Sequence, residues 1–220
     1  MKLWLTIFIA SLFIFATANA TNLDQVRWQP LPGTVALTFD DGPSPSETPE
    51  VLAILKRNNI KATFFVMGWL AKKYPNLIKQ MVAEGHAVAL HTNSHPKLTT
   101  LSNKQLYPEV DEPKKVVADI IGKQPVCLRP PFGLTNSRVN AYIRSRELIP
   151  VPMGFNSFDY ERRGVDKLRE WVVKNAVKGR VFLLHDGYKN REQTVKALPG
   201  MIAGIRQKGL GFSAICYPNS

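Results

Sequence analysis

Cysteine and acidic residues are scarce in this sequence. Two cysteines in 220 residues do not make a disulfide scaffold, and a chain of this length can bury a hydrophobic core without one. Asp and Glu number 17 against 29 Lys and Arg, which gives a formal net charge of +12. This balance indicates an anionic partner: a nucleic acid, an anionic membrane or an acidic polymer.

Internal repeats, low-complexity segments and linkers are absent as well. The hydrophobic fraction of 45% argues against a disordered chain. The 16 prolines and 14 glycines predict many turns rather than a fibrous repeat. We therefore expect one globular domain.

The amino terminus has the features of a secretory signal. Lys2 precedes an uncharged apolar run over residues 3–16, and Ala18-Asn19-Ala20 has the small-x-small form that signal peptidase accepts. A membrane-spanning helix needs about 20 apolar residues, so this run is too short. We predict a cleaved signal peptide over residues 1–20 and a single exported domain over residues 21–220, periplasmic or secreted, with no stable membrane span. Export disfavours a nucleic-acid partner and favours an acidic cell-envelope polymer.

Short β-rich runs alternate with amphipathic stretches along the remaining chain. Strands are predicted at residues 34–38, 62–67, 86–90, 126–128, 148–155, 181–184 and 211–215. Helices are predicted at residues 49–58, 69–84, 102–121, 136–146, 165–176 and 190–208, with Pro108 and Pro113 breaking or restarting the third. Strands separated by helices pair in parallel. The predicted fold is therefore α/β, a distorted (β/α)7-type barrel of parallel strands, with an open doubly wound sheet as the alternative.

Polar residues gather just past the carboxyl ends of the predicted strands. They are Asp40, Asp41, His91, His95, Arg129, Asp159, His185 and Asp186. In a barrel of parallel strands these ends converge on one mouth, which is where such folds carry catalysis. We therefore predict an active site at this end of the barrel.

Two histidines and two carboxylates in this set suit a metal site. His91 and His95 are spaced so that both imidazoles can lie on one side of a helical turn or tight loop. With one carboxylate they would hold zinc or a similar divalent ion and leave a position for water. Asp40 and Asp41 can divide the work, one binding the metal and the other taking a proton from water. The same residues also suit ordinary surface or core histidines and a turn whose Asp caps a helix.

Arg129 and His185 also have two interpretations each. A fixed Arg129 guanidinium can orient a carboxylate, or the residue can be a solvated turn arginine. His185 ends the apolar run VFLL, and Asp159 could keep its ring protonated as an acid for a leaving group. A satisfied buried ion pair is the alternative for His185 and Asp159.

Four short motifs occur in order, at residues 38–44 (TFDDGPS), 91–96 (HTNSHP), 129–133 (RPPFG) and 183–185 (LLH). Together they resemble the polysaccharide deacetylases of the NodB-homology family, the fourth carbohydrate esterase family. The resemblance extends over about residues 35–215, almost the whole predicted mature chain. It implies a distorted (β/α) barrel and a metal-dependent deacetylase.

The resemblance also implies roles for individual residues. The metal ligands would be Asp41, His91 and His95, most often holding zinc and sometimes cobalt or another divalent ion. The catalytic residues would be Asp40 as base, Arg129 as its orienting partner, His185 as acid and Asp159 as the carboxylate that tunes this acid. The substrate-binding residues would be Pro131, Phe132, Tyr160 and Leu183, with Leu183 and Tyr160 lining the acetyl pocket and the Phe132 N–H stabilising the oxyanion.

One motif departs from the family pattern. The family's fourth motif reads Asp-x-x-Asp-Trp, whereas this chain has Asn156-Ser157-Phe158-Asp159-Tyr160. Asp159 is kept, but Tyr160 is smaller than tryptophan and carries a hydroxyl. We expect this change to affect the acetyl pocket and the sugar preference more than catalysis.

The function predicted from sequence is removal of acetyl groups from N-acetylhexosamine residues of an envelope polysaccharide. Peptidoglycan is favoured because it is acidic and the chain is basic. The alternatives are an O-acetyl esterase acting on a xylan-like polymer and a non-catalytic polysaccharide-binding protein. A monomer is expected.

The two cysteines fall on predicted strands that are not neighbours. Cys127 lies in the predicted strand at 126–128, and Cys216 follows the predicted strand at 211–215. A disulfide needs α-carbons within roughly 7 Å of each other. We therefore expect two free thiols.

Overall fold

The computed structural model describes residues 23–218, so the predicted signal peptide lies outside the described residues. Eight strands form one parallel sheet in the order β6-β5-β4-β3-β2-β8-β7, and β9 pairs with the start of β2. They are β2 (Thr34–Asp40), β3 (Thr63–Val66), β4 (Ala87–Leu90), β5 (Cys127–Leu128), β6 (Ile149–Pro150), β7 (Phe155–Asn156), β8 (Val181–His185) and β9 (Gly211–Phe212). A separate antiparallel pair joins β1 (Val26–Arg27) to β10 (Tyr217–Pro218). The parallel sheet and its helices confirm the predicted α/β fold, a distorted (β/α)7-type barrel of parallel strands.

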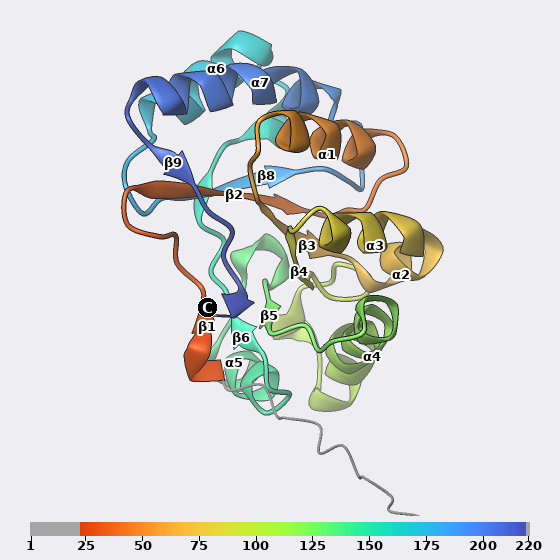
Figure 1. Cartoon of the computed structure of the whole chain (residues 1–220). Helices are drawn as coiled ribbons and strands as arrows, with labels where there is room; N and C mark the ends of the chain where they lie inside the picture. Colours follow the sequence, from red (N-terminus) through yellow and green to blue (C-terminus); the bar gives the residue numbers. More distant parts are fainter. Residues whose placement is uncertain (1–22, 219–220) are drawn as a thin grey trace, which may run out of the picture.

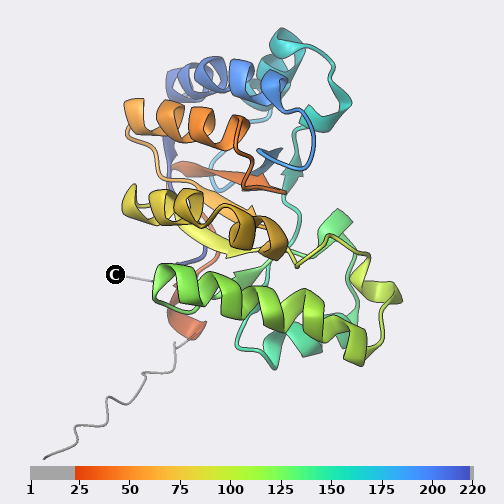
Figure 2. The same cartoon turned by 90° about the vertical axis from the view of Figure 1, so that its right-hand side faces the viewer.

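Helices cover the outer face of the sheet (Figure 1). They are α1 (Glu47–Arg57), α2 (Gly68–Lys73), α3 (Pro75–Ala83), α4 (Asn103–Ile121), α5 (Ser137–Arg144), α6 (Val165–Lys174) and α7 (Glu192–Gln207). Short 3₁₀ turns lie at Leu23–Gln25, Leu98–Thr100, Pro131–Gly133 and Asp159–Glu161. Figure 2 shows α7, α1, α3 and α4 lying side by side in that order.

Two helices differ from those predicted. The helix expected over residues 69–84 is divided before Pro75, because a proline lacks an N–H and suits the first turn of a new helix. α4 continues through Pro108 and Pro113, contrary to the predicted break. Pro113 is buried against Gly68, where an added Cβ would lie 2.5 Å from the proline Cβ. This close packing of α4 on α2 outweighs the helix-breaking tendency of the proline.

The strand predicted over residues 148–155 is two short strands. β6 pairs with β5, whereas β7 pairs with β8, so residues 151–154 cross between the two edges of the sheet. Gly154 makes this crossing possible, because its φ is +80° and a Cβ there would lie 2.8 Å from the Val181 carbonyl oxygen. Within residues 23–218 no pairing joins β6 to β7, so the barrel is incomplete here.

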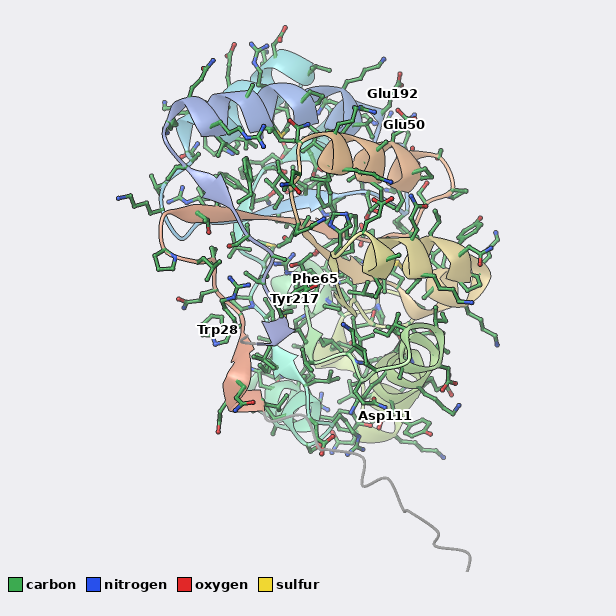
Figure 3. All side chains as sticks on the ribbon, in the orientation of Figure 1. Trp28, Glu50, Phe65, Asp111, Glu192 and Tyr217 are labelled. Carbon is green, nitrogen blue, oxygen red and sulfur yellow. A yellow bond between two sulfur atoms is a disulfide. The ribbon has the colours of Figure 1, made fainter. Side chains whose placement is uncertain are left out.

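Side chains alternate along each strand between two faces of the sheet, one packed against the helices and one facing the barrel interior. On β2, Leu37 and Phe39 pack in the large core with residues of the helices, whereas Ala36 faces inward. Phe65 of β3 also faces inward and lies near the centre of the molecule (Figure 3). By the same alternation Asp40, the last residue of β2, points into the mouth of the barrel.

The prediction of two free thiols is wrong. Cys127 and Cys216 form a disulfide, with α-carbons 5.9 Å apart. The last predicted strand ends early, at Phe212, and the chain then turns into the barrel interior. There Ile215 exchanges hydrogen bonds with the Thr63 hydroxyl at 2.8 and 2.9 Å. The two cysteines therefore meet inside the barrel, and a disulfide there can form between residues that are not on neighbouring strands.

The described residues were searched for membrane spans, and no helix among them is both long and apolar enough to cross a bilayer.

Candidate active site

A pocket of about 620 Å³ opens at the carboxyl ends of β2, β4, β5 and β8. The predicted site residues that line it are Asp40, Asp41, His91, His95, Arg129, Phe132, Tyr160, Leu183 and His185. Asp159 is buried and hydrogen-bonded to His185, and Pro131 is buried next to Phe132 without lining the pocket. The structure thus brings the residues of all the motifs to one cavity.

Three side chains converge as a possible metal-binding group. Oδ1 of Asp41 lies 3.4 Å from Nε2 of His91 and 3.3 Å from Nε2 of His95. This oxygen is buried and has no hydrogen-bond partner among the described residues. An unpaired buried carboxylate oxygen facing two imidazole nitrogens is costly unless a cation joins them. The oxygen and nitrogen donors fit a divalent transition-metal ion.

A contact from the second ring nitrogen orients His91. Its Nδ1 lies 2.7 Å from the backbone carbonyl oxygen of Arg129. A carbonyl can only accept, so Nδ1 carries a proton and donates it, and the lone pair of Nε2 is free to bind a cation beside Asp41. In the absence of an ion, burial alone would raise the pKa of Asp41, but the favourable electrostatic interaction with the nearby His91, His185 and His95 rings outweighs burial and lowers the pKa to about 2.

Left-handed backbone at the strand ends aims the ligands back over the mouth. Asp41 and His95 have φ values of +73° and +67°, a region that non-glycine residues rarely adopt. The His95 N–H donates to the Thr92 hydroxyl at 3.0 Å, which holds that turn. Gly187 packs against the Asp41 carbonyl oxygen, where a Cβ would lie 2.3 Å away. Only glycine fits at position 187 without displacing the Asp41 backbone.

Arg129 fixes Asp40. Its Nη1 donates to Oδ1 of Asp40 at 2.7 Å and to the Thr38 hydroxyl at 2.8 Å, while its Nε donates to the Pro152 carbonyl at 3.2 Å. The guanidinium is 1% exposed and lies 3.9 Å from the centre of the Phe65 ring. A buried, multiply bonded arginine of this kind leaves its carboxylate partner little freedom. The other oxygen of Asp40 is 3.8 Å from Nε2 of His91, so it faces the metal-binding group.

His185 lies beside Asp40 and is held by Asp159. His185 and Asp40 are register partners on the neighbouring strands β8 and β2. Nδ1 of His185 is 2.7 Å from Oδ1 of Asp159, and Oδ2 of Asp159 accepts the His185 backbone N–H and the Thr194 hydroxyl, both at 2.8 Å. Burial alone would lower the pKa of His185, but the charge and hydrogen bond of Asp159 raise it above its ordinary value. His185 can therefore act as a proton donor near neutral pH.

The residues that depart from the family pattern interact with one another. The Asn156 side-chain N–H donates to the Tyr160 hydroxyl at 3.0 Å, and Trp171 Nε1 donates to the Asn156 carbonyl at 3.1 Å. The Tyr160 ring stands edge-on to His185, with centroids 5.7 Å apart. Leu183, the register partner of Asn156 on β8, also lines the pocket. The hydrogen bond to the Tyr160 hydroxyl thus helps to fix its ring beside His185.

Arg191 and Tyr188 also line the pocket, and the sequence did not single them out. Arg191 is 6% exposed, and its Nη2 lies 3.6 Å from Oδ2 of Asp41. The Tyr188 ring stacks on His95 with centroids 5.9 Å apart. Their position in the loop after β8 was the only sequence feature that could have placed them at the site. This feature is weak for Arg191, because it lies six residues after the strand in a chain with many other basic residues.

The profile of the polysaccharide deacetylase family matches residues 29–149 of the chain. The chain is 36% identical over 203 residues to a chitooligosaccharide deacetylase from Sinorhizobium fredii, covering 86% of this chain and 94% of that protein. It is 36% identical over 181 residues to the peptidoglycan-N-acetylglucosamine deacetylase PgdA of Listeria monocytogenes, covering 82% of this chain but only 38% of PgdA. The solved structure of the Bc1960 peptidoglycan N-acetylglucosamine deacetylase matches with a TM-score of 0.82 at 29% identity, covering 88% of this chain and 92% of that chain.

Proposed function

The chain belongs to the polysaccharide deacetylase family, and on this basis we propose that it is a divalent-metal-dependent N-deacetylase of an acidic envelope polysaccharide, peptidoglycan above all. The observation that carries the proposal is the convergence of the Asp41, His91 and His95 donor atoms beside a fixed carboxylate and a fixed imidazole. A binding protein would need the pocket but would not need a paired proton acceptor and proton donor.

Asp41, His91 and His95 would hold the ion. A divalent cation there, most suitably zinc, supplies positive charge that polarises an acetyl carbonyl and makes a nearby water more acidic. The three residues come from two strand-end loops whose backbones are packed in place, so the donors are arranged before the ion arrives.

Asp40 and His185 would carry the protons. Asp40, held by Arg129, accepts a proton from the water that attacks the acetyl carbon. The Phe132 backbone N–H would donate to the resulting oxyanion. His185, kept protonated by Asp159, then gives its proton to the sugar nitrogen as the C–N bond breaks. Acetate and a free amine leave, and Leu183 and Tyr160 would surround the acetyl methyl group during the reaction.

The basic character of the chain supports an acidic substrate. The net charge is +12, and Lys189 and Arg191 line the pocket itself. Peptidoglycan carries lactyl and peptide carboxylates, whereas chitin is neutral. Two relatives named as peptidoglycan-N-acetylglucosamine deacetylases agree with this choice. We propose that the domain over residues 21–220 is exported by a signal over residues 1–20, and protein secreted by a bacterial host should then begin at Thr21 by mass spectrometry.

Acetate release tests the proposed reaction. The purified protein is stripped with a chelator, reloaded with Zn²⁺ or Co²⁺, and given peptidoglycan, chitin oligomers and acetylated xylan. We expect release from peptidoglycan that the chelator abolishes and the metal restores. Release confined to acetylated xylan would identify an O-acetyl esterase. Glycan binding without acetate release, at any metal loading, would identify a non-catalytic binding protein.

A further inference from the structure

The loop between the two histidines of the metal-binding group has an uncommon backbone. It covers residues 92–94 and connects His91 to His95. Thr92 and His95 both have positive φ, at +64° and +67°, and non-glycine residues keep such a conformation only where their surroundings hold them in it. Both imidazoles are attached to the ends of this loop, so its shape sets the spacing between them. The contacts that hold the loop therefore bear on the metal site.

A glutamate of α4, Glu109, accepts three hydrogen bonds from this loop. Its Oε2 accepts the backbone N–H groups of Asn93 at 3.0 Å and of Ser94 at 2.8 Å, and its Oε1 accepts the Ser94 hydroxyl at 2.6 Å. Successive backbone N–H groups that point at one atom form a concave site for an anion. A carboxylate that fills such a site makes hydrogen bonds about twice as strong as those of a neutral acceptor. In the described part of the chain Glu109 forms no salt bridge, so these donors of the loop are its polar partners.

The packing of α4 on α2 fixes the position of Glu109. Glu109 and Pro113 are four residues apart and lie on one side of α4, and Pro113 packs on Gly68 at the start of α2. The two helices lie next to each other (Figure 1). Gly68 in turn donates its N–H to the Thr92 carbonyl oxygen at 2.9 Å. The loop is therefore held from two directions, by α2 on a carbonyl group and by Glu109 on its N–H groups.

We propose that Glu109 is a positioning residue of the metal site, which holds the loop over residues 92–94 so that His91 and His95 are spaced for a divalent ion before the ion binds. The inference rests on the proposed function, which places the ion there. The hydrogen bonds of Glu109 go to the loop and not to the ligands, so it acts on the ion through the backbone that joins the two histidines. This role requires acceptor oxygens at the correct reach from α4, and the negative charge cannot replace that reach.

Three substitutions of Glu109 separate the reach of the side chain from its charge. Glu109→Gln keeps the length and one oxygen for both N–H groups, and its amide can donate to the Ser94 hydroxyl. Glu109→Asp keeps the charge but is one methylene shorter, and Glu109→Ala removes both. The matched control is Glu112→Ala, which removes the same charge from an exposed position three residues further along α4.

The measurements are Zn²⁺ affinity by calorimetry and amide hydrogen exchange of the metal-free protein by NMR. We expect Glu109→Ala and Glu109→Asp to weaken Zn²⁺ binding at least about tenfold, within the range of about 10- to 100-fold that is usual for the outer contacts of a metal site. The Asn93 and Ser94 amide protons should exchange at least about tenfold faster in both variants, because they lose their acceptor. Glu109→Gln should stay within about threefold of the wild type in both measurements, and Glu112→Ala should match the wild type.

The reverse order of the variants would overturn the proposal. If Glu109→Asp binds Zn²⁺ as tightly as the wild type while Glu109→Gln and Glu112→Ala both lose affinity, the charge of α4 acts on the ion and the reach of Glu109 does not. Unchanged exchange of the Asn93 and Ser94 amides in Glu109→Asp would overturn it as well. Urea denaturation reports whether each variant folds, and the comparison of Glu109→Asp with Glu109→Gln is sufficient if Glu109→Ala does not.

These measurements also separate the proposal from the proposed reaction. If the wild-type protein binds Zn²⁺ and the variants follow the expected order while no acetate is released, the role of Glu109 stands and the deacetylase reaction alone fails. If acetate is released but Glu109→Asp and Glu109→Gln bind Zn²⁺ equally tightly, the reaction stands and the role of Glu109 fails. A wild-type protein that binds no divalent ion would refute both.

Discussion

The Cys127–Cys216 disulfide should make a large contribution to stability. The perturbation is its loss, either by unfolding and refolding the protein in a thiol reductant or in the double variant Cys127→Ala/Cys216→Ala. The bond joins residues 89 positions apart. In the chain-entropy treatment of cross-links, a loop of this length lowers the entropy of the unfolded chain enough to stabilise the fold by about 4.6 kcal/mol at 25 °C. Native disulfides typically contribute about 2–5 kcal/mol, so the expected effect is near the top of that range.

Equilibrium denaturation by urea measures this effect. We expect the midpoint to fall on reduction, and the slope of the transition to rise because the unfolded chain without its cross-link exposes more surface. The double variant should lose further stability, since two sulfur atoms leave a packed interior. It is also the control for the reductant itself, which should not move its midpoint. If thiol titration shows full reduction of the wild type and its midpoint is unchanged, the loop-closure reasoning is refuted.

Four other substitutions test the site and the fold. Asp41→Asn should keep the fold and weaken Zn²⁺ binding at least about tenfold by calorimetry, because the amide carries no charge; unchanged affinity would remove Asp41 from the metal site. Arg129→Lys should lower kcat about 10- to 100-fold with little change in KM, because lysine cannot reproduce the planar fork of contacts; wild-type kcat would contradict this. Asp159→Asn removes the charge that raises the pKa of His185, so the acid form is lost at lower pH and the alkaline limb of the kcat/KM profile should move to lower pH; an unmoved limb would mean that it does not report His185. Gly154→Ala should destabilise the fold by about 1–3 kcal/mol, measured by thermal unfolding, because of its positive φ and the close carbonyl; an unchanged Tm would show that the crossing adapts.

The site was predictable because the ends of the strands can be recognised in the sequence. A short β-rich run followed by Asp40 and Asp41, or by His91, fixes where each side chain leaves the sheet. Parallel pairing then brings the ends together without any knowledge of loop structure. The same reasoning was sufficient for the parallel pairing of the strands and for the mouth at which the polar residues meet.

The features that escaped the sequence depend on packing between distant segments. The disulfide forms because the chain after β9 enters the barrel, and strand adjacency carries no information on that path. Pro113 is tolerated within α4 because it packs against Gly68, a contact between two separate helices. Arg191 reaches Asp41 from a loop, and the position of a loop side chain is not encoded in its spacing.

The pairing of Asp40 with His185 has a consequence for how such a protein can change. Neighbouring strands lie about 4.8 Å apart, so Asp40 and His185, the proposed acceptor and donor of protons, are spaced by the backbone hydrogen bonds of β2 and β8. The loops that carry Tyr160 and Tyr188 lie outside this pairing and line the pocket. On the proposed function, exchange of those loops would change which glycan the protein prefers and would leave the spacing of Asp40 and His185 unchanged. The proposed chemistry and the choice of substrate would then evolve on separate parts of the chain.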